Sequence, residues 1–155
     1  MIREKHQDHT CGFVIMPNHV HLLLYFDDNQ VNLNTMIANG KRFMAYELIK
    51  RLQSNQHLEI LAQLAQSCTV KEKAKSQLNK AFEPSFDAKP IYTYAFLQQK
   101  LDYIHHNPVS GKWNLCTSYT NYPHSSAAWY MDGKPHEQLM ITDYRELGWA
   151  DTWIT

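Results

Sequence analysis

GFVIMPNHVHLLLYF, residues 12–26, is the stretch of sequence that decides the fold class. It is an almost continuous apolar run rich in branched and aromatic side chains, a pattern typical of a buried β-strand. Pro17 and Asn18 interrupt the run, because proline cannot donate a ladder hydrogen bond. The stretch therefore predicts a buried strand with an irregular point before its second half.

Working outward from this strand, the remaining sequence favours helices joined by turn-rich segments. Apolar residues recur every four positions over about residues 34–53, and helix-forming residues continue over 57–80. Two prolines within residues 83–92 predict a loop that ends in a short edge strand. We expect a helix over 93–106, ended by the proline that follows it, and a short helix near 125–131. The expected core stripe of the 93–106 helix consists of Leu97, Leu101 and Ile104.

Length and composition limit the class of protein. The chain has 155 residues, of which 44% are hydrophobic and 19% charged, so we expect one globular domain over residues 1–155. Its formal net charge of zero argues against a strongly cationic DNA-binding protein. No apolar run approaches the roughly 20 residues of a membrane helix, and the first ten residues lack the apolar core of a secretion signal. We therefore expect a cytoplasmic protein with no membrane partner.

A pair of histidines, His19 and His21, lies in the predicted strand. Side chains two residues apart leave the same face of a strand, so the two imidazoles can share one metal ion. Val20, Leu22 and Leu24 would then face the core. The alternative is a pair of ordinary half-buried histidines, although polar rings in so apolar a strand are costly unless they have partners.

Tyr103 and Asn107 form a second candidate pair, at the end of the 93–106 helix. A spacing of four places the phenol and the amide on the same helical face. The alternative is structural: Tyr103 would cover the core, and Asn107 would end the helix before Pro108.

At these residues the chain resembles a known family, the Y1 tyrosine transposases of the HUH superfamily. The resemblance is to the IS200-like group, which includes the REP-associated tyrosine transposases. The matching segments are VIMPNHVHLLL at residues 14–24, LDYIHHNPV at 101–109 and YPHSSA at 122–127. It extends over about residues 12–130. It implies an α+β fold, a ferredoxin-like antiparallel sheet with helices packed on it.

The resemblance also implies roles for individual residues. His19, His21 and Asn107 would bind Mg²⁺ or Mn²⁺, since this donor set leaves positions open where a structural zinc site would be closed. Tyr103 would be the nucleophile of a single-stranded DNA endonuclease and strand transferase that forms a 5′-phosphotyrosine and serves DNA transposition. The expected substrate is single-stranded DNA with hairpin-forming ends, and the expected assembly is a homodimer.

Other residues near these segments have weaker assignments. Lys41, Arg42 and Lys89 are candidate contacts to the DNA backbone, although basic residues on a helix are also typical of a solvated face. His105 and His106 lie within the second matching segment, and we expect both at the surface or near DNA.

The chain departs from the family at its amino terminus. Members begin with a strand and a helix ahead of the matching strand, whereas eleven residues precede Gly12 here. We expect the fold to lack these two elements, and the loss of a central strand would expose a sheet edge. The alternative function is accordingly an inactive or domesticated hairpin-DNA-binding remnant. A nucleotide hydrolase with a histidine-triad strand is disfavoured, because Leu23 stands where that class has a further histidine.

Overall fold

The computed structural model describes residues 8–27, 31–83, 86–147 and 152–154. The fold is α+β, and the chain divides into two compact units. We call Met1–Val31 together with Asp87–Thr155 the sheet unit, and Asn32–Phe86 the helical unit. This division describes packing within each unit, so one domain over the whole chain stays a prediction. Among the described residues, no helix combines the length and the apolar character needed to cross a membrane.

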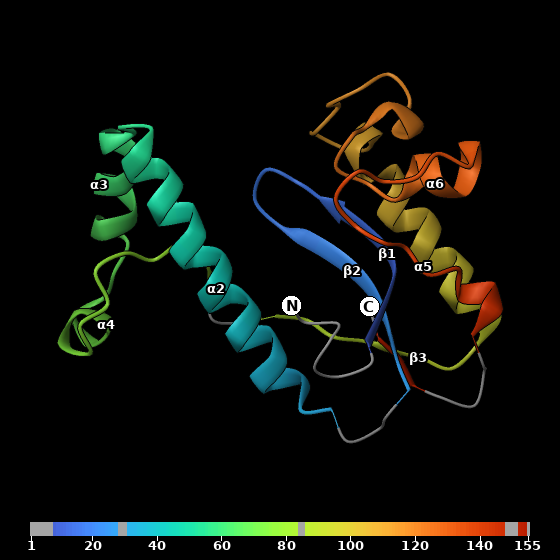
Figure 1. Cartoon of the computed structure of the whole chain (residues 1–155), viewed down its shortest axis with the longest axis horizontal. Coiled ribbons are helices and arrows are strands. Elements are labelled where there is room, and N and C mark those ends of the chain that lie inside the picture. Colours follow the sequence, from blue (N-terminus) through green and yellow to red (C-terminus); the bar gives the residue numbers. More distant parts are fainter. Residues whose placement is uncertain (1–7, 28–30, 84–85, 148–151, 155) are drawn as a thin grey trace. The chain divides into compact units, whose positions relative to one another are not determined.

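The apolar stretch that decides the fold forms a hairpin rather than one strand. β1 (Asp8–Ile15) and β2 (Val20–Phe26) pair in antiparallel register, and Figure 1 shows them joined by a tight connection. The Met16 N–H donates to the His19 carbonyl at 2.8 Å and closes the turn around Pro17. The prediction of a single strand was wrong because the proline marks a reversal of the chain and not an irregularity within a strand.

Two short strands complete the sheet. β3 (Pro90–Ile91) and β4 (Thr152–Ile154) give the order β1-β2-β4-β3, and every pair in this order is antiparallel. The predicted edge strand is confirmed at β3, while the part of its loop at residues 84–85 lies outside the described residues. The expected open edge is not found beside β2, because β4 pairs there.

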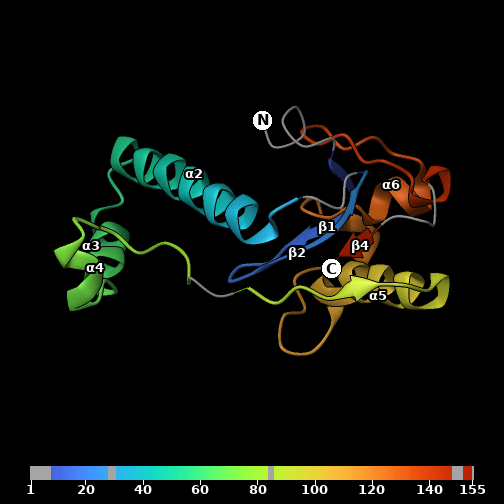
Figure 2. The same ribbon diagram turned by 90° about the horizontal axis from the view of Figure 1, so that it is seen from below.

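Helix α5 (Tyr94–His106) runs along one face of the sheet (Figure 2). The Thr93 side chain caps it by accepting from the Phe96 N–H. The predicted core stripe of Leu97, Leu101 and Ile104 is confirmed, since all three are buried. The packing is close: a Cβ added to Gly12 would lie 2.6 Å from a terminal methyl of Leu101, so only glycine fits without movement of its neighbour.

The face of β2 that packs against α5 is not the one that was predicted. Leu23 and Tyr25 belong to the core cluster, whereas Val20 is 44% exposed and Leu22 is only partly buried. Leu24 is buried but is not a member of that cluster. Alternation along the strand therefore places His21 on the same face as Leu23, which is the face that α5 covers. The prediction that Val20 and Leu22 anchor the strand in the core was wrong, whereas Leu24 is buried as predicted.

The segment after α5 consists of short helices and turns. Its elements are η1 (Asn107–Val109), η2 (Tyr119–Asn121), α6 (Ala127–Asp132) and η3 (Tyr144–Glu146). The short helix predicted near residues 125–131 is confirmed as α6. Just before α6, the chain is bound to the outer edge of β1, where the Ile15 N–H donates to His124 and the Ser126 N–H to Phe13.

The helical unit contains α2 (Leu33–Ser54), α3 (Leu58–Gln66) and α4 (Val70–Ala74). The long helix predicted over 34–53 is confirmed, and Asn32 caps it through a hydrogen bond from the Thr35 N–H. Its stripe is only partly buried, since Leu52 is buried but Met44 is 51% exposed. This unit is therefore held more by local helix signals than by a deep core.

Candidate active site

The hairpin turn positions the histidine pair. His19 closes the turn, and His21 is the second residue of β2, opposite Val14 of β1. The two imidazole rings lie edge to face with their centroids 4.8 Å apart. The predicted convergence of the two rings on one face of the sheet is therefore seen in the structure.

His21 carries an unsatisfied polar atom. Its Nε2 is buried and, among the described residues, has no hydrogen-bond partner. Burial lowers the pKa of this imidazole, with further lowering by the nearby His19 and Lys100, so the ring is neutral near pH 7. A buried acceptor without a partner costs about 1–3 kcal/mol. This atom is therefore suited to bind a group from solution.

His19 is oriented by its neighbour in the turn. Its Nδ1 is hydrogen-bonded to the Asn18 side-chain oxygen, which can only accept, so Nδ1 carries the proton. The Nε2 lone pair then remains for a ligand. A hydrogen bond that fixes the ring tautomer in this way is typical of metal-binding histidines.

Helix α5 brings Tyr103 to the histidine pair. The packing of its apolar stripe leaves Tyr103 on a different face, 56% exposed, and its ring centroid lies 5.4 Å from that of His21. Lys100 lies one turn earlier, with its Nζ 5.9 Å from the Tyr103 ring. Tyr103 is thus accessible to solvent and lies near both an imidazole and a cation.

Asn107 ends α5 and begins η1. Its side chain is buried, and it lines with Tyr103 an open groove of about 600 Å³. The predicted sharing of one helical face by these two residues therefore holds in the structure. Pro108 is also buried, which fixes the end of the helix and with it the position of the amide.

The donors present fit a metal that accepts nitrogen and oxygen ligands. Among the described residues there is no group of three or more His, Cys, Asp or Glu side chains that could hold a metal. The predicted donor set contains two such residues, His19 and His21, whose rings are neighbours, while Asn107 is linked to them only through Tyr103, with which it lines the groove. The free Nε2 of His21 is the observation that favours a ligand here.

Each of the predicted DNA-contact residues has another interaction in the structure. Lys89 is paired with Asp87 at 3.5 Å. Lys41 and Arg42 belong to the helical unit, where the Lys41 ammonium donates to the Glu83 carbonyl and Arg42 lies over Phe43. Their role as DNA contacts stays a prediction.

His105 was placed wrongly by the sequence. It is 1% exposed, and its Nε2 lies 2.8 Å from the Ser126 Oγ, which also accepts from the Phe13 N–H at 2.9 Å. Burial holds the pKa of His105 at about 4, with a smaller contribution from His106. His105 thus joins α5 to β1 through Ser126. A signal for this burial existed, because His105 continues the four-residue spacing of Leu97 and Leu101.

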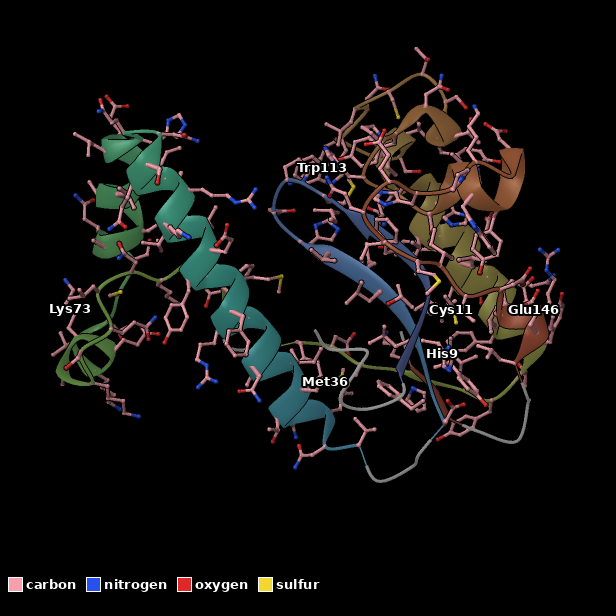
Figure 3. All side chains as sticks on the ribbon, in the orientation of Figure 1. His9, Cys11, Met36, Lys73, Trp113 and Glu146 are labelled. Atoms are coloured by element: carbon pink, nitrogen blue, oxygen red, sulfur yellow. The ribbon has the colours of Figure 1, made fainter. Side chains whose placement is uncertain are left out.

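Two further residues of the site were not singled out from the sequence. Lys100 precedes Tyr103 by three positions, so helical spacing could have placed it on the same side. Trp113 lies beside the β1–β2 turn (Figure 3), with its ring centroid 6.2 Å from that of His19. No periodicity could have found Trp113, because it follows a turn in which Gly111 has a φ of 59°.

Comparisons of the chain with protein-family models, with curated proteins and with solved structures found no match.

Proposed function

We propose that the protein is a metal-dependent endonuclease and strand transferase for single-stranded DNA, with Tyr103 as nucleophile. The observation that carries the proposal is the unpartnered, buried Nε2 of His21 beside the exposed Tyr103 ring, with 5.4 Å between the two ring centroids. A neutral His21 imidazole with His19 beside it, next to a solvent-accessible phenol, suits metal-assisted phosphoryl transfer to tyrosine.

The metal would be bound by His19 and His21, with Asn107 as the oxygen donor. Three donors of this kind leave coordination positions open for phosphate and water, and Mg²⁺ or Mn²⁺ is the ion that the family resemblance implies. A bound ion of this kind would neutralise charge on the scissile phosphate and act on it as a Lewis acid. The lowered pKa of His21 supports the assignment, because only a neutral imidazole has a free lone pair for a metal.

The protein groups would carry out the exchange of bonds. The Tyr103 oxygen forms a bond to phosphorus as the bond to the 3′ oxygen breaks, and the phenol proton is lost while the 3′ hydroxyl gains one. The product is a 5′-phosphotyrosine, and attack by another 3′ hydroxyl reverses the step on a new strand. Lys100 is placed to stabilise negative charge near Tyr103, since its ammonium lies 5.9 Å from the ring.

We propose further that the α+β fold has a ferredoxin-like core, and the arrangement of its strands supports this proposal. Its order β1-β2-β4-β3, antiparallel throughout, places β4 between β2 and β3. In such a core, β4 would occupy the central position that the family resemblance gives to the family's first strand. The histidine strand and the tyrosine helix would then pack as neighbours, as β2 and α5 do here.

The proposed substrate is single-stranded DNA with a hairpin, because the reacting phosphate must reach Tyr103 without a paired strand in the way. A homodimer is the assembly that the resemblance implies. Lys41, Arg42 and Lys89 remain proposed contacts to the DNA backbone.

The test is formation of a covalent protein–DNA adduct. Purified chain is incubated with labelled hairpin oligonucleotides that carry single-stranded flanks, with Mn²⁺ or with EDTA, and separated under denaturing conditions. We expect a shifted band only with the metal, absent in Tyr103→Phe and His21→Ala. Tyr92→Phe is the matched control, because Tyr92 is 80% exposed and does not line the groove.

Two results would contradict the proposal. An adduct that persists in Tyr103→Phe would move the nucleophile elsewhere. Hairpin binding with no adduct across a broad set of oligonucleotides and metals would favour the DNA-binding remnant instead.

A further inference from the structure

The groove beside Tyr103 extends well beyond the residues used for the reaction. It has a volume of about 600 Å³, within the range of roughly 300–1,000 Å³ typical of ligand sites. The last turns of α5 form one wall, and the turn over residues 110–113 forms the other. Its lining residues are Gln99, Asp102, Tyr103, His106, Asn107, Ser110, Gly111, Lys112 and Trp113. Only two of these nine residues, Tyr103 and Asn107, have a role in the proposed reaction.

The histidine pair does not line the groove, but one residue of each wall makes a ring contact with a histidine. Tyr103 lies against His21, with 5.4 Å between their ring centroids. On the other wall, Trp113 lies 6.2 Å from His19 by the same measure. A phosphate bound at the histidines would therefore lie near both the phenol and the indole.

Trp113 is held as a rigid aromatic surface. Its ring is partly buried and packs against the core cluster, and its backbone N–H donates to the Ser110 carbonyl. Lys112 extends over the indole, with its Nζ 5.1 Å from a ring centroid. An aromatic face with a cation above it is the combination that binds unpaired nucleotides, whose bases stack and whose phosphates are anionic.

The carboxylate and the ammonium of the groove lining lie on different walls. Asp102 is the carboxylate on the lining, and it is paired with His106 at 3.1 Å. His106 in turn lies against the Tyr119 ring, with their centroids 4.2 Å apart. Asp102 is thus engaged on the α5 wall, and Lys112 is the cation of the opposite wall.

We propose that this groove holds the unpaired nucleotide adjacent to the scissile phosphate, with its base stacked on Trp113 and its phosphate beside Lys112. The assignment rests on the proposed function, because it places this nucleotide next to the phosphate that Tyr103 attacks. The base takes the position of the Lys112 side chain over the indole, and the ammonium moves to the phosphate. Stacking accepts any base, so the groove positions the strand and does not read its sequence.

The test measures binding separately from cleavage. Dissociation constants of labelled single-stranded and hairpin oligonucleotides are determined in a Tyr103→Phe background with Mn²⁺ present. Trp113→Leu fills the same part of the core but cannot stack, and we expect it to raise Kd about tenfold. Trp113→Phe retains a ring and should bind within about threefold of the parent. Tyr92→Leu removes an exposed aromatic residue that does not line the groove, and should leave Kd unchanged.

Abasic sites then locate the contact. A series of oligonucleotides carries one abasic position each, moved stepwise through the flank. At one position, loss of the base should weaken binding by the parent protein but not by Trp113→Leu, because both changes remove the same contact. Lys112→Gln should lower the slope of log Kd against log salt concentration by the amount expected for about one phosphate contact. The abasic position at which binding weakens should stay the same.

The outcomes separate this inference from the proposed function. If the Trp113→Leu effect is the same at every abasic position, or if Trp113→Leu binds like the parent, the groove assignment is overturned even if Tyr103 forms an adduct. If the coupling is found but wild-type protein forms no adduct, the groove binds single strands and the nuclease proposal fails. Thermal unfolding of each variant shows that the fold is retained.

Discussion

The sheet unit and the helical unit are built by different means. Every member of the buried core cluster among the described residues lies in the sheet unit, from Cys11 in β1 to Tyr144 in η3. The helical unit buries only Met36, Leu52 and Cys68 among its described apolar side chains. Two of its helices begin at side-chain caps, with Asn32 for α2 and a capping box at Thr69 for α4, whereas α3 has no side-chain cap.

This difference shows where a site can be positioned. Tyr103 and the histidine pair are each attached to elements whose other faces are buried, so their relative positions are set by packing over many residues. A side chain on a helix held mainly by local signals has no such constraint. The candidate site accordingly lies in the unit that has the core, and the following predictions test this contrast.

The largest effect is expected from the core of α5. Leu97 is fully buried, so Leu97→Ala should lower the free energy of unfolding by about 2–5 kcal/mol, through lost burial and a cavity. Met44→Ala in α2 is the matched truncation, and a change within about 0.5 kcal/mol is expected because Met44 is half exposed. Urea denaturation followed by circular dichroism measures both. Equal decreases in the free energy of unfolding for the two variants would contradict the difference in core packing between the units.

A smaller effect is expected from acid, through His105. Its pKa of about 4 lies below the ordinary value of 6.5, so between these values the unfolded chain binds more protons than the folded one. The stability that the neutral His105 contributes is therefore fully present above pH 6.5. As the pH is lowered, the free energy of unfolding falls by about 3 kcal/mol between pH 7 and pH 4. His105→Gln keeps a donor for Ser126 but cannot titrate.

Urea denaturation of both proteins in EDTA, at pH values from 7 to 4, provides the measurement. The free energy of unfolding is compared between wild type and His105→Gln at each pH. The difference between the two proteins gives the contribution of His105 apart from that of the other histidines. Parallel curves would mean that His105 is not a buried, neutral link between α5 and β1.

The smallest effect is expected at the start of α2. Asn32→Ala removes the hydrogen bond that caps the helix, at a cost of about 1 kcal/mol, whereas Asn32→Ser can keep it. Hydrogen exchange read by mass spectrometry should show faster exchange over residues 33–40 in the alanine variant alone. Exchange in β1 and β2 should be unchanged, and an equal increase there would show that the two units unfold together.

Much of the secondary structure could be predicted because its signals are local. Helix α5 begins after a capping Thr93 and ends before Pro108, and its apolar spacing names the residues that are buried. The hairpin was missed because an apolar run with a proline fits both an interrupted strand and a turn. The face of β2 that meets the core could not be read either, since apolar residues stand on both faces of that strand.

The candidate site likewise contains residues that could be predicted from the sequence and residues that could not. His19, His21, Tyr103 and Asn107 were identified from spacing and from the family resemblance, and the structure brings the two histidines to the phenol. The burial of His105 depends on Ser126, which lies on another segment and is brought to it only by the fold. Trp113 likewise reaches His19 only once the turn after η1 has formed. Trp113 thus has no periodic signal in the chain, and the spacing that indicates the burial of His105 does not identify Ser126 as its partner.

The most direct measurement is the identity of the residue that carries DNA after reaction. Wild-type protein is incubated with a hairpin oligonucleotide and Mn²⁺, digested with protease and nuclease, and its peptides are sequenced by mass spectrometry. The account predicts a nucleotide attached through its 5′ phosphate to Tyr103, and none when His19 and His21 are both replaced by alanine. A nucleotide on another residue, or one on Tyr103 that persists without the histidines, would contradict it.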